Sequence, residues 1–330
     1  MGQKEHKYYN HRGDLLYRKV TEVPMFYTMT LNPALDYNMT LKEFEAERVN
    51  RSVKEEMIPG GKGLMVSRML KNLGIESTAF GLVAGFTGTE LTRMIHELGV
   101  RTNFVSLPSG MTRINVKLWG GLEGEINANG PACDEKSLQA LFEKLSVLGK
   151  EDTLVLSGSV PSSLPKDVYV DMIKVVKDKG TRFVVDATGE LLRSTLSYRP
   201  FLIKPNHHEL GELYGVTLTT KEDVARYAKK LRTEGARNVL VSMAGDGAVL
   251  VAEDGSVWFG EAPEGQVVNT VGSGDSMVAG FLAGDEATHT AEQAFKTGIA
   301  SGSASAFSAK LGTKDEVEAL LQRVQVKREE

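Results

Sequence analysis

The sequence contains one cysteine, Cys133, among its 330 residues, so an intramolecular disulfide is excluded. It has no apolar run long enough to span a membrane and no hydrophobic signal-peptide core. Positive charge is not in excess either, because 39 Lys and Arg stand against 43 Asp and Glu, a net charge of -4. We therefore expect a cytoplasmic protein with no membrane partner and no nucleic-acid partner, in which any phosphate binding is local.

The composition is that of a globular protein with a sizeable core, since 41% of residues are hydrophobic and 25% are charged. The first 24 residues differ, because they are polar and basic and have no regular apolar period. We expect residues 1–24 to be a poorly ordered N-terminal extension, with a surface segment packed on the domain as the alternative. Residues 25–330 then form a single domain.

Short β-branched runs alternate with longer helical stretches along this domain. Strands are predicted at 26–31, 78–83, 104–107, 153–157, 182–186 and 238–242, and helices at 62–72, 90–98, 166–179, 221–233, 274–283 and 291–307. This alternation predicts an α/β fold, a three-layer sandwich with a mainly parallel central sheet and helices on both faces. Two regions, 35–58 and 111–130, contain strand-like stretches without following helices, and we expect them to form a small β-sheet lid.

A glycine-rich segment, PGGKGLMVSRMLKNLG, surrounds Lys62 with Gly60, Gly61 and Gly63 just before a predicted helix. Glycines let the backbone approach a ligand closely, and a helix start offers free N–H groups to an anion. The segment is not a nucleotide P-loop, because glycine rather than Ser or Thr follows the lysine. The alternative is a glycine-rich turn with a solvated lysine.

Two further segments offer candidate ligand contacts. In MTRINVKL, Arg113 lies on a predicted lid strand, and together with Lys62 it would form a clamp for a phosphate monoester. A solvated charge at a sheet edge is the alternative. In LVLSGSVP, Ser157 ends a strand where parallel sheets bind ligands, although a tight turn explains the small residues equally well.

The segment LIKPNHHELGEL places Lys204, Asn206 and Glu209 at a strand-to-helix junction. Asn206 and Glu209 have the spacing of a capping box. A functional interpretation is compatible with this one, in which Glu209 holds Mg²⁺ through water while Lys204 and Asn206 face nucleotide phosphates. The segment VSMAGDGAVLV, residues 241–251, is either a hairpin turn or a backbone cradle for a nucleotide.

The segment NTVGSGDSMVAGF places the amides of Gly272, Ser273, Gly274 and Asp275 before a predicted helix. Such a helix start stabilises the negative charge that develops on a transferring phosphoryl group. A carboxylate beside it can accept the proton of an attacking hydroxyl, which predicts Asp275 as a general base. The alternative is that Asp275 only complements the helix dipole.

Together these segments resemble the PfkB family of sugar kinases, which has the ribokinase-like fold, from about Met25 to the C-terminus. GGKG and TVGSGDSMVAG match the two family signatures, and KPNHHE matches its Asn-x-x-Glu motif. The resemblance implies an ATP- and Mg²⁺-dependent kinase. TLNPALDY, TRINVKL and GEINANGP resemble the branch that phosphorylates sugar phosphates.

The expected reaction is phosphorylation of D-fructose 1-phosphate at its 6-hydroxyl to give fructose 1,6-bisphosphate. Tagatose 6-phosphate or fructose 6-phosphate is the alternative acceptor. A non-catalytic regulator that binds sugar phosphate is a further alternative.

The resemblance also implies roles for the matching residues. Asp275 is the catalytic base, and the amides of Gly272, Ser273 and Gly274 form the anion hole. The substrate is bound by Asp36, Gly60, Gly61, Lys62, Arg113 and Ser157, with Lys62 and Arg113 holding its phosphate. The nucleotide is bordered by Lys204, Asn206, Glu209, Ser242, Gly247 and Thr270, with Glu209 as the water-mediated metal contact. The lid is expected to form a homodimer interface.

Two positions depart from the family pattern. Met65 stands where an asparagine usually contacts the sugar, and a thioether cannot donate a hydrogen bond. Ala244 stands where the nucleotide loop usually has glycine, and we expect Gly245 to compensate by a small shift. Neither change touches the predicted anion hole or base.

Overall fold

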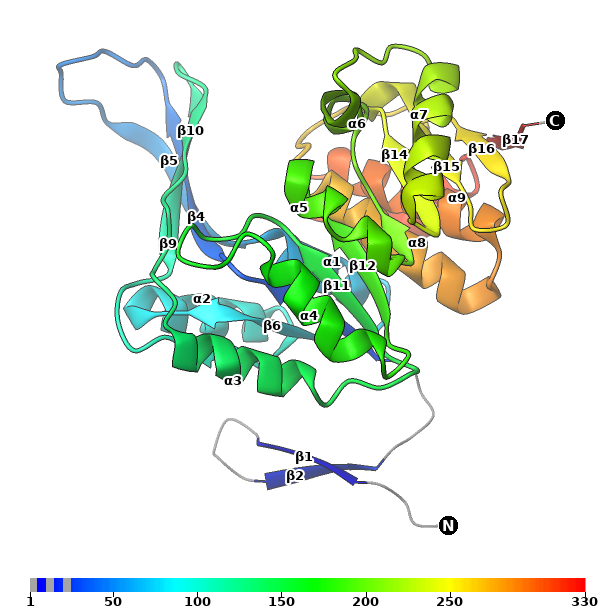
Figure 1. The fold of residues 1–330 in the computed structure, drawn as a ribbon. Coiled ribbons are helices and arrows are strands. Elements are labelled where there is room, and N and C mark those ends of the chain that lie inside the picture. Colours follow the sequence, from blue (N-terminus) through cyan, green and yellow to red (C-terminus); the bar gives the residue numbers. More distant parts are fainter. Residues whose placement is uncertain (1–4, 10–14, 20–24, 330) are drawn as a thin grey trace.

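An eleven-stranded sheet forms the middle layer of the structure (Figure 1). This computed structural model describes residues 5–9, 15–19 and 25–329. The strands run in the order β17 (Val326–Arg328), β16 (Val257–Gly260), β15 (Ala248–Val251), β14 (Asn238–Ser242), β13 (Leu202–Ile203), β12 (Arg182–Asp186), β11 (Thr153–Ser157), β3 (Phe26–Thr30), β6 (Ser77–Val83) and β7 (Arg101–Thr102), and β8 (Val105–Ser106) also pairs with β6. Pairing is parallel from β14 to β7 and antiparallel from β14 to β17. The predicted mainly parallel sheet is therefore confirmed.

Helices cover both faces of this sheet, with one apolar cluster on one face and two on the other. One face is covered by α1 (Lys62–Asn72), α2 (Gly85–Glu97), α8 (Ser273–Thr288), α9 (Ala291–Ala306) and α10 (Lys314–Leu321). The other is covered by α3 (Glu135–Leu145), α4 (Val168–Lys177), α5 (Gly189–Arg193), α6 (His207–Tyr214) and α7 (Lys221–Glu234). Along β11, Leu154 and Leu156 enter one core and Val155 enters the other. Burial on both faces explains why the strand is apolar throughout.

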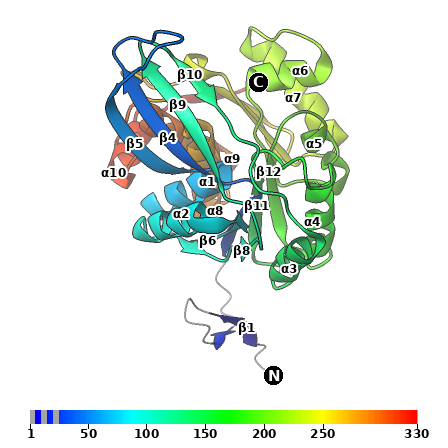
Figure 2. The ribbon, with the colours of Figure 1, turned by 90° about the vertical axis from the view of Figure 1, so that its left-hand side faces the viewer.

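A second sheet stands away from the main body (Figures 1 and 2). Its order is β10 (Gly124–Ile126), β9 (Arg113–Gly120), β4 (Ala34–Leu41) and β5 (Ser52–Gly60). These strands lie in the two regions predicted to leave the strand–helix rhythm. Because β4 and β9 pair in parallel with Asp36 opposite Asn115, the side chains of these two residues share one face.

Near the N-terminus, β1 (Glu5–Tyr9) and β2 (Leu15–Lys19) form a separate antiparallel pair. Residues 1–4, 10–14 and 20–24 lie outside the described residues, so the predicted poor order of this extension stays a prediction. Helices α3 and α10 were not predicted, although Asp134 and Thr313 cap them as the sequence allows. Among the described residues, no helix is long and apolar enough to cross a membrane.

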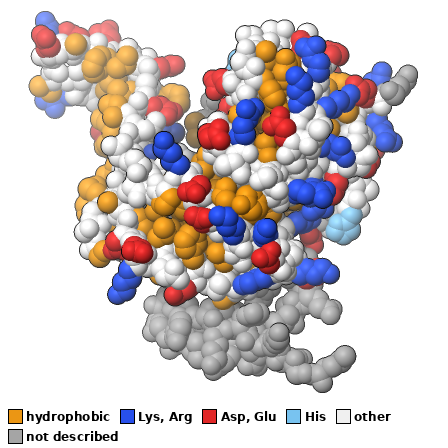
Figure 3. Space-filling view, viewed as in Figure 1, with side chains coloured by type: hydrophobic (Ala, Val, Ile, Leu, Met, Phe, Trp, Pro, Cys, Tyr) orange, Lys and Arg blue, Asp and Glu red, His pale blue; other side chains and the backbone are white. Residues whose placement is uncertain are grey.

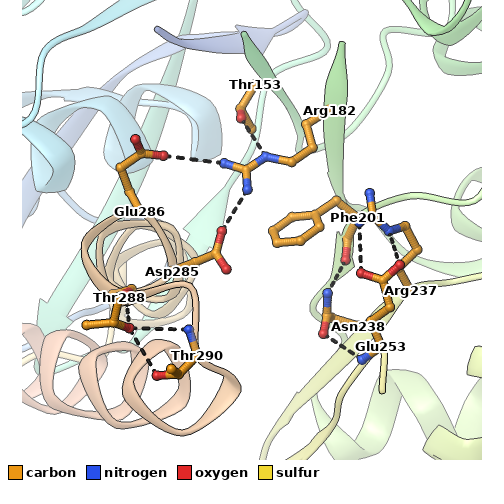
Figure 4. Close-up of polar contacts among 11 residues, drawn as sticks. Thr153, Arg182, Phe201, Arg237, Asn238, Glu253, Asp285, Glu286, Thr288 and Thr290 are labelled. Atoms are coloured by element: carbon orange, nitrogen blue, oxygen red, sulfur yellow. Dashed lines mark hydrogen bonds and ion pairs between the residues drawn. The ribbon is translucent and has the colours of Figure 1, made fainter. Parts of the chain in front are cut away.

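The edge of the sheet where β12 begins is fixed by an arginine (Figure 4). Arg182 pairs through Nη1 with Asp285 of α8 at 2.7 Å and through Nη2 with Glu286 at 3.8 Å, and its Nε donates to Thr153 Oγ1 at 3.0 Å. Its guanidinium also stacks on Phe201, 4.5 Å from the ring centroid. These contacts hold the C-terminal half of α8 against β11 and β12.

Replacing Arg182 with methionine is expected to lower the free energy of unfolding by about 1–3 kcal/mol, because Asp285 loses its partner in a largely buried place. Arg237→Met is the matched control, since Arg237 also stacks on Phe201 and pairs with a carboxylate, Glu253, in a more exposed setting. That change should cost less than about 1 kcal/mol. Urea denaturation measures both, and equal losses would contradict the role given to the Asp285 pair.

Candidate active site

A cavity of about 1040 Å³ lies between the second sheet and the carboxyl ends of the central strands. We call it the main cavity, and Figure 3 shows a hollow between the second sheet and the main body. It is lined by several residues that the sequence predicts for the site: Asp36, Gly61, Lys62, Arg113, Ser157, Glu209 and Asp275. The fold therefore brings together residues from distant segments.

The N-terminus of α8 opens into this cavity with an unusual backbone. Gly272 precedes the helix with φ +81°, and a Cβ there would lie 2.8 Å from Leu311 Cδ2, so only glycine fits without strain. The N–H of Ser273 donates to the carbonyl of Thr270 at 3.2 Å. Free amides for an anion are thus expected from Gly274 and Asp275 rather than from Ser273.

A residue that the sequence analysis missed, Asp186, lies at the centre of the site. It is the last residue of β12 and is 1% exposed. Its Oδ1 lies 3.5 Å from the Nζ of Lys62 and 3.7 Å from the Nζ of Lys204. One carboxylate therefore holds the two lysines in place. The available signal was an acidic residue ending an apolar strand at the carboxyl edge of a parallel sheet.

Asp186 and the two lysines set the protonation of Asp275. Burial and then the charge of Asp186 raise the pKa of Asp275 to about 7, although Lys62 and Lys204 oppose the shift. Burial opposes ionisation of Asp186, yet the charges of Lys204 and Lys62 keep its pKa below the usual value. The charge of Asp186 in turn raises the pKa of Lys62. The pair of carboxylates thus contains one group poised to exchange a proton near neutrality.

Lys62 and Arg113 both line the main cavity, but they are held by different elements. Lys62 is bound to Asp186 on the main sheet, and Asp275 contributes to its electrostatic environment. Arg113 lies on β9, where Nε donates to the carbonyl of Asn32 at 3.1 Å and Nη1 to that of Ala128 at 3.2 Å. A clamp formed by Lys62 and Arg113 around one phosphate stays a prediction.

The second sheet contributes two residues that were also missed. Asn115 Nδ2 donates to Asp36 Oδ1 at 2.8 Å, and Lys117 Nζ lies 3.4 Å from Asp36 Oδ2. All three side chains are buried. Gly60 is required beside them, because a Cβ there would lie 2.6 Å from Asp36 Oδ2. The sequence TRINVKL could have identified Asn115 and Lys117, because the period of two in a strand places positions 113, 115 and 117 on one face.

The start of α6 contains the predicted capping box. Asn206 Oδ1 accepts from the N–H of Glu209, and Glu209 Oε2 accepts from the N–H of Asn206, both at 2.8 Å. A backbone bridge aligns Asn206 with Ser242. Among the described residues, no group of three or more His, Cys, Asp or Glu could hold a metal. One carboxylate oxygen of Glu209 is engaged in the capping box, so the other is left to contact a metal through water. Such a metal would be bound to the phosphates of the ligand.

In the loop after β14, position 244 has a backbone conformation that glycine favours, although the residue there is alanine. Ala244 has φ +49°, in the left-handed region that L-residues rarely adopt, so the predicted compensation by Gly245 does not occur. Gly247 has φ +88°, and a Cβ there would lie 2.1 Å from the carbonyl oxygen of Gly260. Thr270, in contrast, is exposed and lines a different cavity.

That side cavity, as we call it, has a volume of about 670 Å³ and lies between the second sheet, α1 and the segments 267–271 and 309–311. Met65, Lys117 and Val271 line both cavities. Met65 is buried, and its Sδ accepts from Arg68 Nη1 at 3.2 Å. The residue that departs from the family pattern thus lies in the wall between the two cavities.

Several buried polar atoms of the main cavity have no hydrogen-bond partner within the described residues. They are Thr30 Oγ1, Asn32 Oδ1 and Ser157 Oγ. Buried polar groups are normally satisfied, so such atoms beside a cavity indicate a ligand rich in hydroxyl or phosphate oxygens.

Known proteins are similar to this chain in both sequence and fold. The model of the pfkB family of carbohydrate kinases matches residues 29–317. The chain is 46% identical to 1-phosphofructokinase of Bacillus subtilis (strain 168), covering 92% of this chain and all of the relative. It is 32% identical to D-tagatose-1-phosphate kinase of Bacillus licheniformis, covering 92% and 99%. The crystal structure of phosphofructokinase-2 from Escherichia coli in complex with fructose-6-phosphate superposes with a TM-score of 0.83 at 28% identity, covering 90% and 98%.

Replacing Asp275 with asparagine is expected to stabilise the ligand-free protein by about 1–3 kcal/mol at pH 8. The unfolded carboxyl ionises near its model value of 3.8, whereas the folded one keeps its proton until about 7, so wild-type stability falls as the pH rises between these values. Asparagine removes this loss, and the advantage of the variant should grow from pH 4 to 7. Denaturant titrations at several pH values measure it.

The control for this prediction is Asp186→Asn. Because the pKa of Asp186 is lowered in the folded state, its ionised form stabilises the fold, and the variant should be less stable at pH 8. If Asp275→Asn also destabilised the protein at pH 8, the assigned direction of the Asp275 shift would be wrong.

Proposed function

The chain belongs to the pfkB family of carbohydrate kinases, and on that premise we propose that it transfers the γ-phosphoryl group of ATP to a sugar phosphate. One observation carries the proposal: a buried carboxylate with a pKa of about 7, Asp275, lies at a helix N-terminus beside Lys62 and Lys204. A base, anion-binding amides and cations at one place are what phosphoryl transfer requires. The main cavity beside them is lined by Asp36, Arg113 and Ser157, whose side chains can bind the hydroxyl and phosphate groups of a sugar phosphate.

The proposed acceptor is D-fructose 1-phosphate, phosphorylated at its 6-hydroxyl to give fructose 1,6-bisphosphate. The 46% identity to a 1-phosphofructokinase over the whole length of that relative supports this choice. D-Tagatose 1-phosphate is the nearest alternative, because a relative carries that name and the two ketoses differ only in configuration at C4. Tagatose 6-phosphate and fructose 6-phosphate carry their phosphate at the other end of the sugar.

In the proposed mechanism, Asp275 accepts the proton of the 6-hydroxyl as its oxygen attacks the γ-phosphorus. A bond forms between that oxygen and phosphorus, the bond from phosphorus to the β–γ bridging oxygen breaks, and ADP leaves. The amides of Gly274 and Asp275 stabilise the charge on the transferred group, as do Lys62 and Lys204. Asp186 is a positioning residue, because it fixes both lysines and raises the proton affinity of the base.

The remaining assignments follow from the same arrangement. Asp36, held by Asn115 and Lys117, binds sugar hydroxyls, and Arg113 contacts the phosphate of the acceptor. Ser157, Gly60 and Gly61 also contact the acceptor. The nucleotide lies along Lys204, Asn206, Ser242 and Gly247, whereas Thr270 faces the side cavity and is not assigned to the nucleotide. Mg²⁺ bound to ATP neutralises phosphate charge, and Glu209 is the residue that would hold it through water.

We place the enzyme in the cytoplasm, where its single cysteine stays reduced.

Asp275→Asn is expected to lower kcat by about 10²–10⁴-fold while changing the Kd for ATP less than threefold, because the base acts only in the chemical step. In the wild type, kcat/KM should rise with pH up to about 7 and then level off, since only the ionised carboxylate accepts a proton. A coupled ADP-release assay with Mg·ATP measures both, using fructose 1-phosphate, tagatose 1-phosphate, tagatose 6-phosphate and fructose 6-phosphate.

Fructose 1-phosphate should have the highest kcat/KM of the four. A 6-phosphate as the best substrate would keep the kinase and reject the acceptor. Binding of sugar phosphates without turnover would favour the non-catalytic regulator, and near-normal turnover of Asp275→Asn would reject the base.

We also propose that the chain forms a homodimer through the second sheet. The face of this sheet opposite Asp36 carries exposed apolar side chains, with Val53, Met57 and Ile126 at 55%, 37% and 64% exposure. Exposed apolar clusters on a sheet are typical of interfaces, because a partner removes them from water.

Ile126→Asp is expected to convert the dimer to a monomer at micromolar concentration, because a carboxylate cannot be buried there without a partner. Size-exclusion chromatography with light scattering measures the mass. Phe86→Asp is the matched control, since Phe86 is 75% exposed on α2, outside the second sheet, and that variant should stay dimeric. A monomeric wild type would reject this interface.

A further inference from the structure

The side cavity contains a guanidinium without an acidic partner. Arg68 projects from α1 and is half-buried, yet no carboxylate of the described residues lies within ion-pairing distance. Its Nη1 donates to Met65 Sδ at 3.2 Å and to the carbonyl of Pro59 at 3.5 Å. Burial lowers the pKa of Arg68 without any compensating charge. A half-buried cation in this state is stabilised by any anion that can reach it.

The other charges around this cavity reinforce that preference. Lys54, Lys117 and Lys310 line it together with Arg68, against two carboxylates, Glu56 and Glu97. Glu97 is already engaged by Arg93 on its own helix. Lys54 and Lys310 are exposed and form no ion pair among the described residues, so both can turn towards a ligand.

The main cavity has the opposite balance. Four cations line it against six carboxylates. Lys62 is bound by Asp186, and Lys117 lies 3.4 Å from Asp36 and 3.6 Å from Glu125. Arg113 is engaged by two backbone carbonyls. By the charges of the lining side chains alone, the side cavity therefore favours an added anion more than the main cavity does.

We propose that the side cavity is a second anion site, in which Arg68 and Lys310 bind the phosphate of a phosphate monoester. A guanidinium offers several N–H donors that match phosphate oxygens, and Lys310 adds a mobile charge. Ile58, Val271 and Leu311 supply apolar wall for the organic part of the ester. When a phosphate binds, Arg68 Nη1 would donate its hydrogen bond to a phosphate oxygen instead of to Met65 Sδ, which is a weak acceptor.

Two sources could supply this phosphate. Because Met65 and Lys117 line both cavities, the acceptor in the main cavity could extend its single phosphate past Met65 to Arg68, in place of the contact with Arg113. A separate phosphorylated ligand is the second source. The anion site itself does not depend on the proposed reaction, whereas the first source does.

Calorimetric titration with inorganic phosphate, in the absence of nucleotide, tests the site. Arg68→Met is expected to weaken phosphate binding at least tenfold and Lys310→Met about threefold. Lys314→Met is the matched control, because Lys314 is a nearby exposed cation that lines neither cavity and pairs with Glu318, and it should leave the Kd unchanged. Lys310 is exposed, so its variant tests the site even if Arg68→Met folds poorly.

Steady-state kinetics then distinguish the sources. If the acceptor supplies the phosphate, both variants should raise the KM for fructose 1-phosphate by the same factors and leave the KM for ATP unchanged. If the KM for fructose 1-phosphate stays constant while phosphate affinity falls, a separate ligand uses the site.

Phosphate binding that neither Arg68→Met nor Lys310→Met weakens would overturn the proposal. So would an Arg68→Met variant that loses phosphate binding together with thermal stability while Lys310→Met binds normally, since Arg68 would then be structural. A protein that binds phosphate as expected but phosphorylates no sugar would contradict the proposed function and leave this site intact.

Discussion

The buried carboxylate of Asp186 is the interaction on which the rest of the site depends. A carboxylate that is 1% exposed stays ionised only if cations repay its lost hydration, and here two lysines from different segments do so. Lys62 begins α1 and Lys204 follows β13, so the same charge fixes a helix start and a strand end relative to β12. The fold supplies this arrangement because parallel strands end at a common edge, where helices begin.

Close packing keeps these charges at their positions. A Cβ on Gly274 would lie 3.0 Å from Lys204 Nζ, and one on Gly60 would meet the carboxylate of Asp36. The glycines therefore define how near the charged groups approach the backbone. Because Asp275 and Asp186 are buried, small changes in those distances change the proton affinity of Asp275 more than they would in water. At the other end of the sheet, the ion pair between Arg182 and Asp285 holds α8 in place.

Local sequence signals were sufficient for most of the fold. Strands β11, β12 and β14 and helix α1 occur where the apolar pattern predicts them, because each is buried in the way its pattern implies. In the site, glycine motifs located Asp275 and Lys62, which lie on elements with strong local signatures. Asp186, Asn115 and Lys117 were missed because the local pattern only places them at the edge or face that lines the site, whereas their roles depend on charged partners from distant segments. The left-handed backbone of Ala244 was not predicted because its neighbours hold it in a conformation that alanine itself disfavours.

The parallel pairing of β4 with β9 has a consequence for how the chain folds. Ala34 is opposite Arg113, so this half of the second sheet requires closure of a long loop, whereas the β4–β5 hairpin can form locally. During synthesis, β4 and β5 emerge from the ribosome well before their partner β9 exists. Their apolar face and an unpaired strand edge are then open to other chains. The segment that completes the substrate end of the site therefore presents an open strand edge during synthesis, and its hairpin tip does not offset this by charge, because Glu43, Glu45 and Glu47 are balanced by Lys42, Arg48 and Arg51.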